Sequence, residues 1–155
     1  MPQRAFVLLS VPHVQQRSES DCLAACVDMV LKYLDAPTNY QRLIRTLRID
    51  EEVGTPFPNI QRLNRLGVTV VFRQGSIAQL YKFLQNGWPV IIPVKTKELP
   101  HWDADTDHAV VVVGMNEEEI YINDPAFERA PIAITRGDFD LAWLERDEYY
   151  AVLAP

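Results

Sequence analysis

The strongest secondary-structure signal of this chain is Asp21-Cys22-Leu23-Ala24-Ala25-Cys26-Val27-Asp28-Met29-Val30-Leu31-Lys32-Tyr33-Leu34. Its apolar side chains recur at helical spacing, and Cys22, Cys26 and Met29 belong to the same stripe. Ser20 or Asp21 can cap the free backbone N–H groups at the start. The stretch therefore predicts an amphipathic helix over residues 21–34 that begins with a cysteine.

The flanking sequence continues in short elements that end at prolines and glycines. A β-rich run over residues 5–11 ends at Pro12, and residues 15–20 are polar and indicate a loop. Hydrophobic spacing then predicts three further helices and one strand, in the order helix 39–47, helix 58–66 closed by Gly67, strand 68–72 and helix 76–85.

The second half of the chain is rich in β-strand signals. Strands are predicted at 88–94, 109–114, 120–123, 131–135 and 149–153, with a helical turn at 138–143. Two prolines in 88–94 favour an edge or bulged strand, whereas the apolar run 109–114 favours the interior of a sheet. Helices first and an antiparallel sheet second predict the α+β class.

Composition narrows the possible functions. The chain has 155 residues, of which 48% are hydrophobic and 23% charged, and its formal net charge is -6. This size predicts one domain over residues 1–155, and the acidic balance gives no support for binding nucleic acid or an anionic membrane. No apolar stretch reaches the ~20 residues of a membrane helix, and the start lacks the apolar core of a signal peptide. We therefore expect a cytoplasmic protein.

The two cysteines have different expected roles. Cys22 lies at the helix start, where free N–H groups and the helix dipole stabilise a thiolate, the nucleophilic form of the side chain. The alternative is that Cys22 is a small buried apolar residue, as most free cysteines are. Cys26 lies one turn deeper on the same face, where packing is the expected role. Pairing of the two is disfavoured, because positions i and i+4 give poor disulfide geometry.

His108 and Asp124 are the candidate base and its orienting carboxylate. His108 opens the apolar strand, so it would be held rigidly at a sheet margin. A turn at residues 116–118 would bring Asp124 to within a few residues of the position opposite His108, where its carboxylate could accept the ring N–H. The alternatives are a surface histidine and the ordinary turn chemistry of Asn123-Asp124-Pro125.

Gln16 is the candidate donor for an oxyanion. Its side-chain amide could converge with the Cys22 backbone N–H on the oxygen of a tetrahedral intermediate, although Gln15 is an adjacent competitor. The acidic loop 103–107 resembles a calcium loop but lacks the turn glycine and the distal glutamate. We expect it to be a solvated lip of the site, together with His101 and Trp102.

Four short stretches resemble motifs of one known family. They are Gln16-Arg17-Ser18-Glu19-Ser20-Asp21-Cys22 with Ala25, Cys26 and Met29; Gly87-Trp88-Pro89-Val90-Ile91; His108-Ala109-Val110-Val111-Val112-Val113-Gly114; and Ile122-Asn123-Asp124-Pro125. In this order they resemble the cysteine motif, central strand, histidine motif and aspartate motif of the C39-type cysteine peptidases. These are papain-like domains best known for cutting double-glycine leader peptides from bacteriocin precursors.

The resemblance implies a role for each of four residues. It makes Cys22 the nucleophile, His108 the base, Asp124 the orienting residue and Gln16, rather than Gln15, the oxyanion donor. It also implies a papain-like fold in which a helical half carries the cysteine and a sheet half carries the histidine and aspartate.

Two departures from the family pattern concern the substrate. Leu23 stands where the family usually has glycine, so the cleft beside the nucleophile could be narrower. The leader peptidases are commonly fused to a membrane transporter, and no such segment is found here, so we expect a free-standing C39-like domain.

We therefore predict a cysteine peptidase that hydrolyses a peptide bond through a Cys22 thioester, with a leader-type peptide as one candidate substrate. The alternatives are an acyl transferase with the same residues and a catalytically silent peptide-binding domain. We expect a peptide or protein partner, with no metal or organic cofactor.

Overall fold

The computed structural model of the chain describes residues 6–155. Its helices are α1 (Cys22–Tyr33), α2 (Tyr40–Thr46), η1 (Phe57–Leu66), α3 (Ile77–Gln85), η2 (Thr96–Glu98) and α4 (Arg136–Leu144). Its strands are β1 (Val7–Leu8), β2 (Thr69–Gln74), β3 (Val90–Lys95), β4 (Asp107–Met115), β5 (Glu119–Asn123), β6 (Ile132–Thr135) and β7 (Tyr149–Ala154). The predicted α+β class is confirmed. Of the predicted run 5–11, residue 5 lies outside the described residues.

The strands form one antiparallel sheet. Its order is β2-β7-β3-β4-β5-β6, and β1 pairs with the end of β4. The predicted hairpin is confirmed, because β4 and β5 pair antiparallel with Val111 opposite Asn123. This register places the first residues of β4 close to the last residues of β5, on the side of the sheet where these two strand ends meet.

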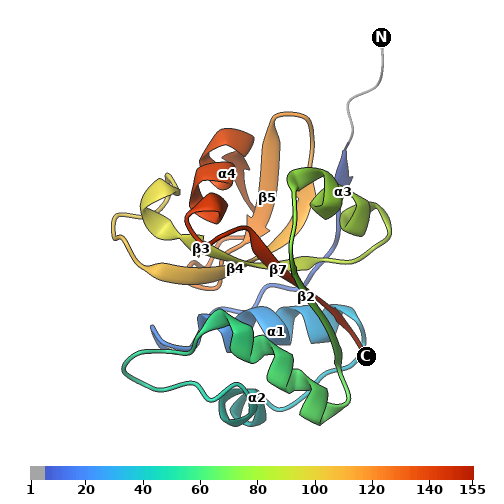
Figure 1. Cartoon of the computed structure of the whole chain (residues 1–155), viewed down its shortest axis with the longest axis vertical. Coiled ribbons are helices and arrows are strands. Elements are labelled where there is room, and N and C mark those ends of the chain that lie inside the picture. Colours follow the sequence, from blue (N-terminus) through green and yellow to red (C-terminus); the bar gives the residue numbers. More distant parts are fainter. Residues whose placement is uncertain (1–5) are drawn as a thin grey trace.

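Both faces of the sheet are covered. Figure 1 shows α1 and α2 on one side of the sheet and α3 and α4 on the other. Along β4, residues 109, 111 and 113 join the core around α1, while residues 110 and 112 join the core around α3 and α4. Alternate side chains of a strand point to opposite faces, so an apolar run without alternation matches a strand buried on both sides.

Helix α1 is almost fully buried between the sheet and the other helices of its half. Residues 24–27 and Met29 have no exposed surface, which agrees with the apolar composition of the stretch. Asp21 occupies the N-cap position, but its side chain accepts no capping bond from the helix. The expected side-chain cap is therefore absent, because the Asp21 carboxylate binds the preceding loop instead.

Two predictions about local structure are wrong. The segment predicted as a third α-helix is the 3-10 helix η1, closed as expected by Gly67 in the left-handed conformation. The strand with two prolines is not at an edge, because β3 lies between β7 and β4. Pro93 is tolerated there because β7 pairs with β3 only at Ile91, whereas Pro89 precedes the strand.

Long-range bonds hold the segment before α1 against the end of β5 and the residues that follow it. The Asn123 amide donates to the carbonyl of Val11 at 3.2 Å, and the Gln16 backbone N–H donates to the carbonyl of Pro125 at 2.8 Å. His13 Nε2 lies 2.6 Å from the carbonyl oxygen of Phe127. The start of α1 is therefore fixed beside the edge of the sheet where β4 begins and β5 ends.

No helix among residues 6–155 combines the length and apolar character that crossing a membrane requires.

Candidate active site

His108 and Asp124 form a buried hydrogen-bonded pair. His108 is the second residue of β4, and Asp124 directly follows β5. His108 Nε2 lies 2.6 Å from Asp124 Oδ1, and the side chains are 3% and 0% exposed. An ionised carboxylate only accepts, so Nε2 carries the proton and donates it. The expected approach of these two residues across the hairpin is confirmed.

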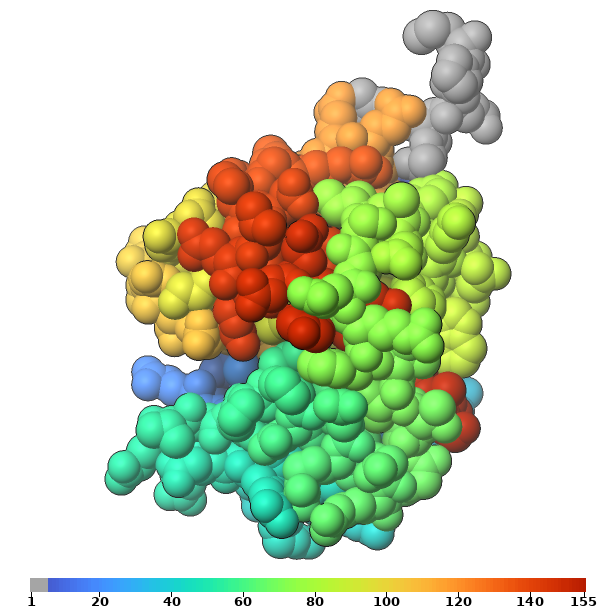
Figure 2. Space-filling model, in the orientation of Figure 1, coloured from blue at the N-terminus to red at the C-terminus, as the bar shows by residue number. Residues whose placement is uncertain are grey.

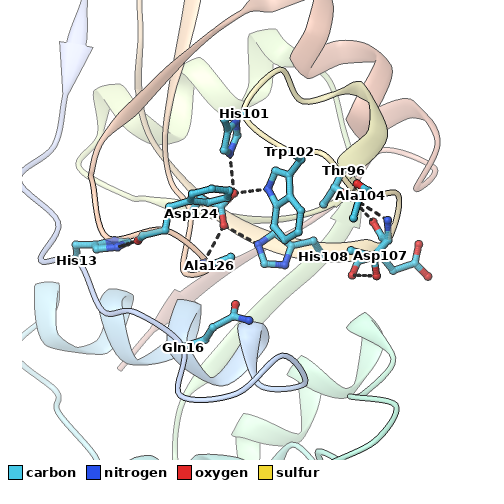
Figure 3. Close-up of polar contacts among 12 residues, drawn as sticks. His13, Gln16, Thr96, His101, Trp102, Ala104, Asp107, His108, Asp124 and Ala126 are labelled. Carbon is cyan, nitrogen blue, oxygen red and sulfur yellow. Dashed lines mark hydrogen bonds and ion pairs between the residues drawn. The ribbon is translucent and has the colours of Figure 1, made fainter.

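Asp124 accepts three further hydrogen bonds, which Figure 3 shows converging on its carboxylate. The backbone N–H of Ala126 donates to Oδ1 at 3.0 Å. His101 Nε2 and Trp102 Nε1 each lie 2.8 Å from Oδ2. Each carboxylate oxygen thus has two donors, including the one from His108, and rotation of the group would break all four bonds.

The surroundings of this pair favour its charged form. Burial alone would raise the pKa of Asp124, but the hydrogen bonds from His101, His108 and Trp102 hold it well below its usual range. Burial alone would lower the pKa of His108, but its hydrogen bond to Asp124 and its interactions with Asp124 and Cys22 raise it to about 9. At neutral pH the pair is therefore an imidazolium beside a carboxylate.

Cys22 and His108 line the same cleft. Cys22 is the first residue of α1 and is half-buried, and its interaction with the imidazole contributes to the raised pKa of His108. Because Nε2 of His108 is bound to Asp124, Nδ1 is the ring nitrogen that remains for another partner. A thiol beside an imidazole that is itself bound to a carboxylate is a combination that can activate a nucleophile.

Cys26 lies one turn behind Cys22 and is fully buried. Burial raises the pKa of its thiol well above the ordinary value, and the charges at Cys22 and Asp124 add to this effect. Its expected packing position in the core is confirmed.

The loop before α1 is folded by the Asp21 carboxylate. The backbone N–H and hydroxyl of Ser18 donate to it at 2.7 and 2.9 Å, and the backbone N–H of Arg17 donates at 3.2 Å. A short hydrogen bond from the Tyr40 hydroxyl of α2 completes the set. Burial alone would raise the pKa of Asp21, but these bonds outweigh it and lower the pKa. Asp21 therefore ties the loop that carries Gln16 to the helical half.

Gln16 lies in this loop beside the catalytic candidates. Figure 3 shows its side chain extending toward the segment of Ala126 and His108. Its amide Nε2 donates one hydrogen bond to the carbonyl of Ser18 at 3.0 Å, and its Oε1 is buried without a partner among residues 6–155. An amide NH₂ group has two donors, so one N–H remains for another acceptor. Gln15, the competing candidate, is exposed.

Cys22 and His108 line a cleft of about 680 Å³ between the two halves of the fold. One wall comes from the start of α1 and residues 51–58, and the other from Pro93, residues 106–109 and Arg146. Figure 2 shows this hollow at the left margin, where residues near position 20 lie between the two halves. Cys22 and His108 are therefore accessible to a molecule that occupies the cleft.

The two walls of the cleft differ in charge. On the sheet wall, Asp107 is paired with Lys95 at 3.4 Å and with Arg146 at 3.6 Å. On the helical wall lie three carboxylates, those of Glu19, Glu51 and Glu52. None of these three forms an ion pair with another residue in the described part of the chain. The cleft consequently has one electrically balanced wall and one acidic wall.

Two residues of the site were only partly anticipated from the sequence. His101 and Trp102 were expected at the lip of the site, but their bonds to Asp124 were not. The available signal was indirect: two adjacent side chains with ring N–H groups precede an acidic loop that leads to a candidate base. Hydrogen bonds of Thr96 to residues 104 and 106 shape that loop.

Residues 6–155 contain no group of three or more His, Cys, Asp or Glu side chains arranged to hold a metal ion.

Comparisons with known proteins identify a family and a fold. The family model described as the Peptidase C39 family matches residues 10–147. A comparison with curated proteins gives no match. A solved structure of a protein from Bacillus anthracis described as C39-like peptidase is 22% identical, with 99% of this chain and 98% of that chain covered and a TM-score of 0.78.

Two further solved structures come from transporter-associated peptidases. A double glycine motif protease from an AMS/PCAT transporter, in complex with the leader peptide, is 22% identical, with 96% and 94% of the two chains covered and a TM-score of 0.74. The peptidase domain of Streptococcus ComA, a bi-functional ABC transporter involved in quorum sensing, is 19% identical, with 92% and 96% covered and a TM-score of 0.73. At these identities the likeness shows a shared fold.

Proposed function

Because this chain belongs to the peptidase C39 family, we propose that it is a cysteine peptidase that hydrolyses peptide bonds through a thioester on Cys22. The observation that carries the proposal is the buried hydrogen-bonded pair of His108 and Asp124, which lies together with Cys22 at the wall of an open cleft. A metal ion or organic cofactor has no part in the proposed reaction.

Acylation begins with attack by the sulfur of Cys22 on the carbonyl carbon of the substrate. The new C–S bond pushes the π electrons of the carbonyl onto its oxygen. The Cys22 backbone N–H and the remaining N–H of the Gln16 amide are proposed to bind that oxyanion. His108 then donates its proton to the amine nitrogen, the C–N bond breaks, and the amine fragment leaves.

Deacylation uses the same residues in reverse. His108, now neutral, takes a proton from water, and the resulting hydroxide equivalent attacks the thioester carbon. The C–S bond breaks, the acid fragment leaves, and the thiolate–imidazolium pair is restored. Asp124 stabilises the imidazolium in both halves of the reaction and keeps Nδ1 directed at the sulfur.

A peptide is the proposed substrate class. Support comes from the structural neighbour that is in complex with a leader peptide. Leu23, 3% exposed, lines the cleft next to the nucleophile at the position where the family usually has glycine. We therefore propose peptide hydrolysis in general, with leader-type peptides as one candidate.

Hydrolysis is separable from the two alternatives by isotope labelling. The protein is incubated with a pool of synthetic peptides in ¹⁸O-labelled water, and fragments are identified by mass spectrometry. Peptide hydrolysis gives acid fragments that carry one ¹⁸O atom from water. Transfer to an added amine such as glycinamide gives an amide product instead and supports an acyl transferase. Peptides that bind without any fragmentation support a silent binding domain and contradict the proposal.

The acidic wall of the cleft predicts a preference for positively charged peptides. Glu51 and Glu52 carry charges that no described residue neutralises, so a lysine near the scissile bond would be attracted and a glutamate repelled. For otherwise identical peptides, we expect kcat/KM to be about 10-fold higher with lysine than with glutamate at 20 mM salt, and the ratio to fall as salt screens the charges.

Matched variants assign this preference to the cleft. Glu51→Gln and Glu52→Gln should each reduce the lysine-to-glutamate ratio. Asp35→Asn removes the same charge beyond the end of α1 opposite Cys22, roughly 18 Å away at 1.5 Å per residue, and should leave the ratio unchanged. A ratio near one in the unmodified protein, or an equal effect of all three variants, contradicts the charge argument.

A further inference from the structure

The carboxylate of Asp124 has one oxygen that the proposed reaction does not use. Oδ1 binds His108, whereas Oδ2 accepts from His101 Nε2 and Trp102 Nε1, each at 2.8 Å. We propose that His101 is a positioning residue, which acts with Trp102 on Oδ2 and thereby holds Oδ1 in line with His108. The inference rests on the role proposed for Asp124 and concerns a residue to which that reaction gives no part.

The environment of His101 fits this role. Its side chain is only 8% exposed, and among the described residues its one polar partner is Asp124. Its other ring nitrogen, Nδ1, is buried without a hydrogen-bond partner, which is an unfavourable state for a polar atom. The position of the ring thus leaves one nitrogen without a hydrogen bond. The bond from Nε2 to Asp124 is the only polar contact that the ring makes among the described residues.

Aromatic packing fixes the two donors in place. The ring of Phe127 packs edge-to-face against the rings of His101 and Trp102, with ring centroids 4.9 Å and 5.4 Å apart. The backbone carbonyl of Phe127 is in turn bound by His13 at 2.6 Å. Trp102 also packs edge-to-face on the ring of His108 at 4.8 Å, so it covers the His108–Asp124 bond as well as donating to the carboxylate.

The geometry gives His101 a specific effect on the reacting pair. Without its N–H, Oδ2 would keep only the donor from Trp102, and three bonds instead of four would oppose rotation of the carboxylate. The bond to His108 would then be made for less of the time, and the imidazolium would lose part of the stabilisation that it gains from Asp124. A change at His101 is thus expected to alter the titration of His108, although His101 does not touch the substrate.

The test measures the charge on His108 through the reactivity of Cys22, without a peptide substrate. Cys22 is alkylated with anionic iodoacetate and, separately, with neutral iodoacetamide, and the rates at Cys22 are read by peptide mass mapping. A neighbouring imidazolium attracts only the anionic reagent, so the ratio of the two rates falls as His108 loses its proton. In the unmodified protein we expect the midpoint of this fall near pH 9.

Two substitutions separate the hydrogen bond from the shape of the ring. His101→Phe keeps a ring against Phe127 but has no donor, and we expect the midpoint to fall by about one pH unit. His101→Gln places an amide N–H near the position of Nε2 and should restore most of the original midpoint. Should His101→Phe fail to give a normal circular dichroism melt, His101→Asn serves in its place, because its shorter amide cannot reach Asp124.

The outcomes are distinct from those that bear on the proposed function. An unmodified protein whose ratio shows no fall near pH 9 contradicts the thiolate–imidazolium pair, and with it the proposed peptidase. A normal fall in the unmodified protein with an unchanged or higher midpoint in His101→Phe or His101→Asn overturns only the role of His101. Equal shifts in His101→Gln and His101→Phe also overturn it, because the donor would then be irrelevant.

Discussion

Replacing Cys22 with alanine is expected to lower the rate of peptide cleavage by roughly 10⁴- to 10⁶-fold, because no other group in the cleft can form the thioester. The side chain is half-buried at the first position of α1, outside the fully buried part of the helix. The fold should therefore survive, with a circular dichroism melt close to that of the unmodified protein. Cleavage is measured by chromatography and mass spectrometry of the peptide fragments.

Cys26→Ala is the matched control for Cys22→Ala. It also removes one thiol from α1, but from a side chain with no exposed surface and no contact with the cleft. We expect cleavage within a few-fold of the unmodified rate, together with a loss of about 1 kcal/mol of stability from the small cavity. Substantial cleavage by Cys22→Ala, or equal loss in both variants, contradicts the assignment of Cys22 as the nucleophile.

Asp124→Ala is expected to affect both activity and stability. The side chain has no exposed surface and accepts bonds from His108, Ala126, His101 and Trp102, all of which would lose their acceptor. Leaving the buried His108 charge without its partner should lower the free energy of unfolding by about 3–5 kcal/mol, measured by urea denaturation. Cleavage should fall by about 10⁴-fold, because His108 is no longer held or stabilised in its charged form.

Asp124→Asn separates the charge from the packing. It keeps the size of the side chain and one acceptor oxygen, so we expect a smaller loss of stability than in Asp124→Ala but a similar loss of activity. A variant that loses stability but keeps full activity would show that Asp124 is structural only. Full activity in Asp124→Asn would likewise contradict its role in stabilising the imidazolium.

The pH dependence of cleavage follows from the raised pKa of His108. The protonated ring is the group that donates to the leaving amine, and its pKa is raised from 6.5 to about 9. The proton is therefore held at neutral pH and lost as the pH rises through about 9, so the rate should decline above that value. In Asp124→Asn the hydrogen bond and charge that raise the pKa are weakened, and the decline should begin at a lower pH.

Local sequence signals predicted the parts of the site that depend on local structure. The helix that begins at Cys22 follows from the spacing of its apolar residues, and η1, although not an α-helix, ends at the expected Gly67. The approach of His108 to Asp124 could be predicted because a short hairpin fixes the register of its two strands. In each of these cases few residues separate the partners, so the sequence between them decides the geometry.

Contacts that depend on the packing of distant segments could not be predicted. The order of strands in the sheet places β3 in the interior, although two prolines suggested an edge. The bonds from His101 and Trp102 to Asp124 depend on the path of the loop between β3 and β4, which no spacing rule specifies. The Asp21 side chain binds the loop and Tyr40 instead of capping α1, because α2 packs beside the helix start.

The measurement that tests the central proposal most directly is alkylation of the unmodified protein by iodoacetate at pH 6, with Cys22 and Cys26 quantified separately by peptide mass mapping. It needs no knowledge of the substrate, and the buried Cys26 serves as an internal reference. We predict that Cys22 reacts at least about 10-fold faster than Cys26 and that His108→Ala removes most of this advantage. Slow labelling of both cysteines that rises in parallel only at alkaline pH would contradict an activated nucleophile at Cys22.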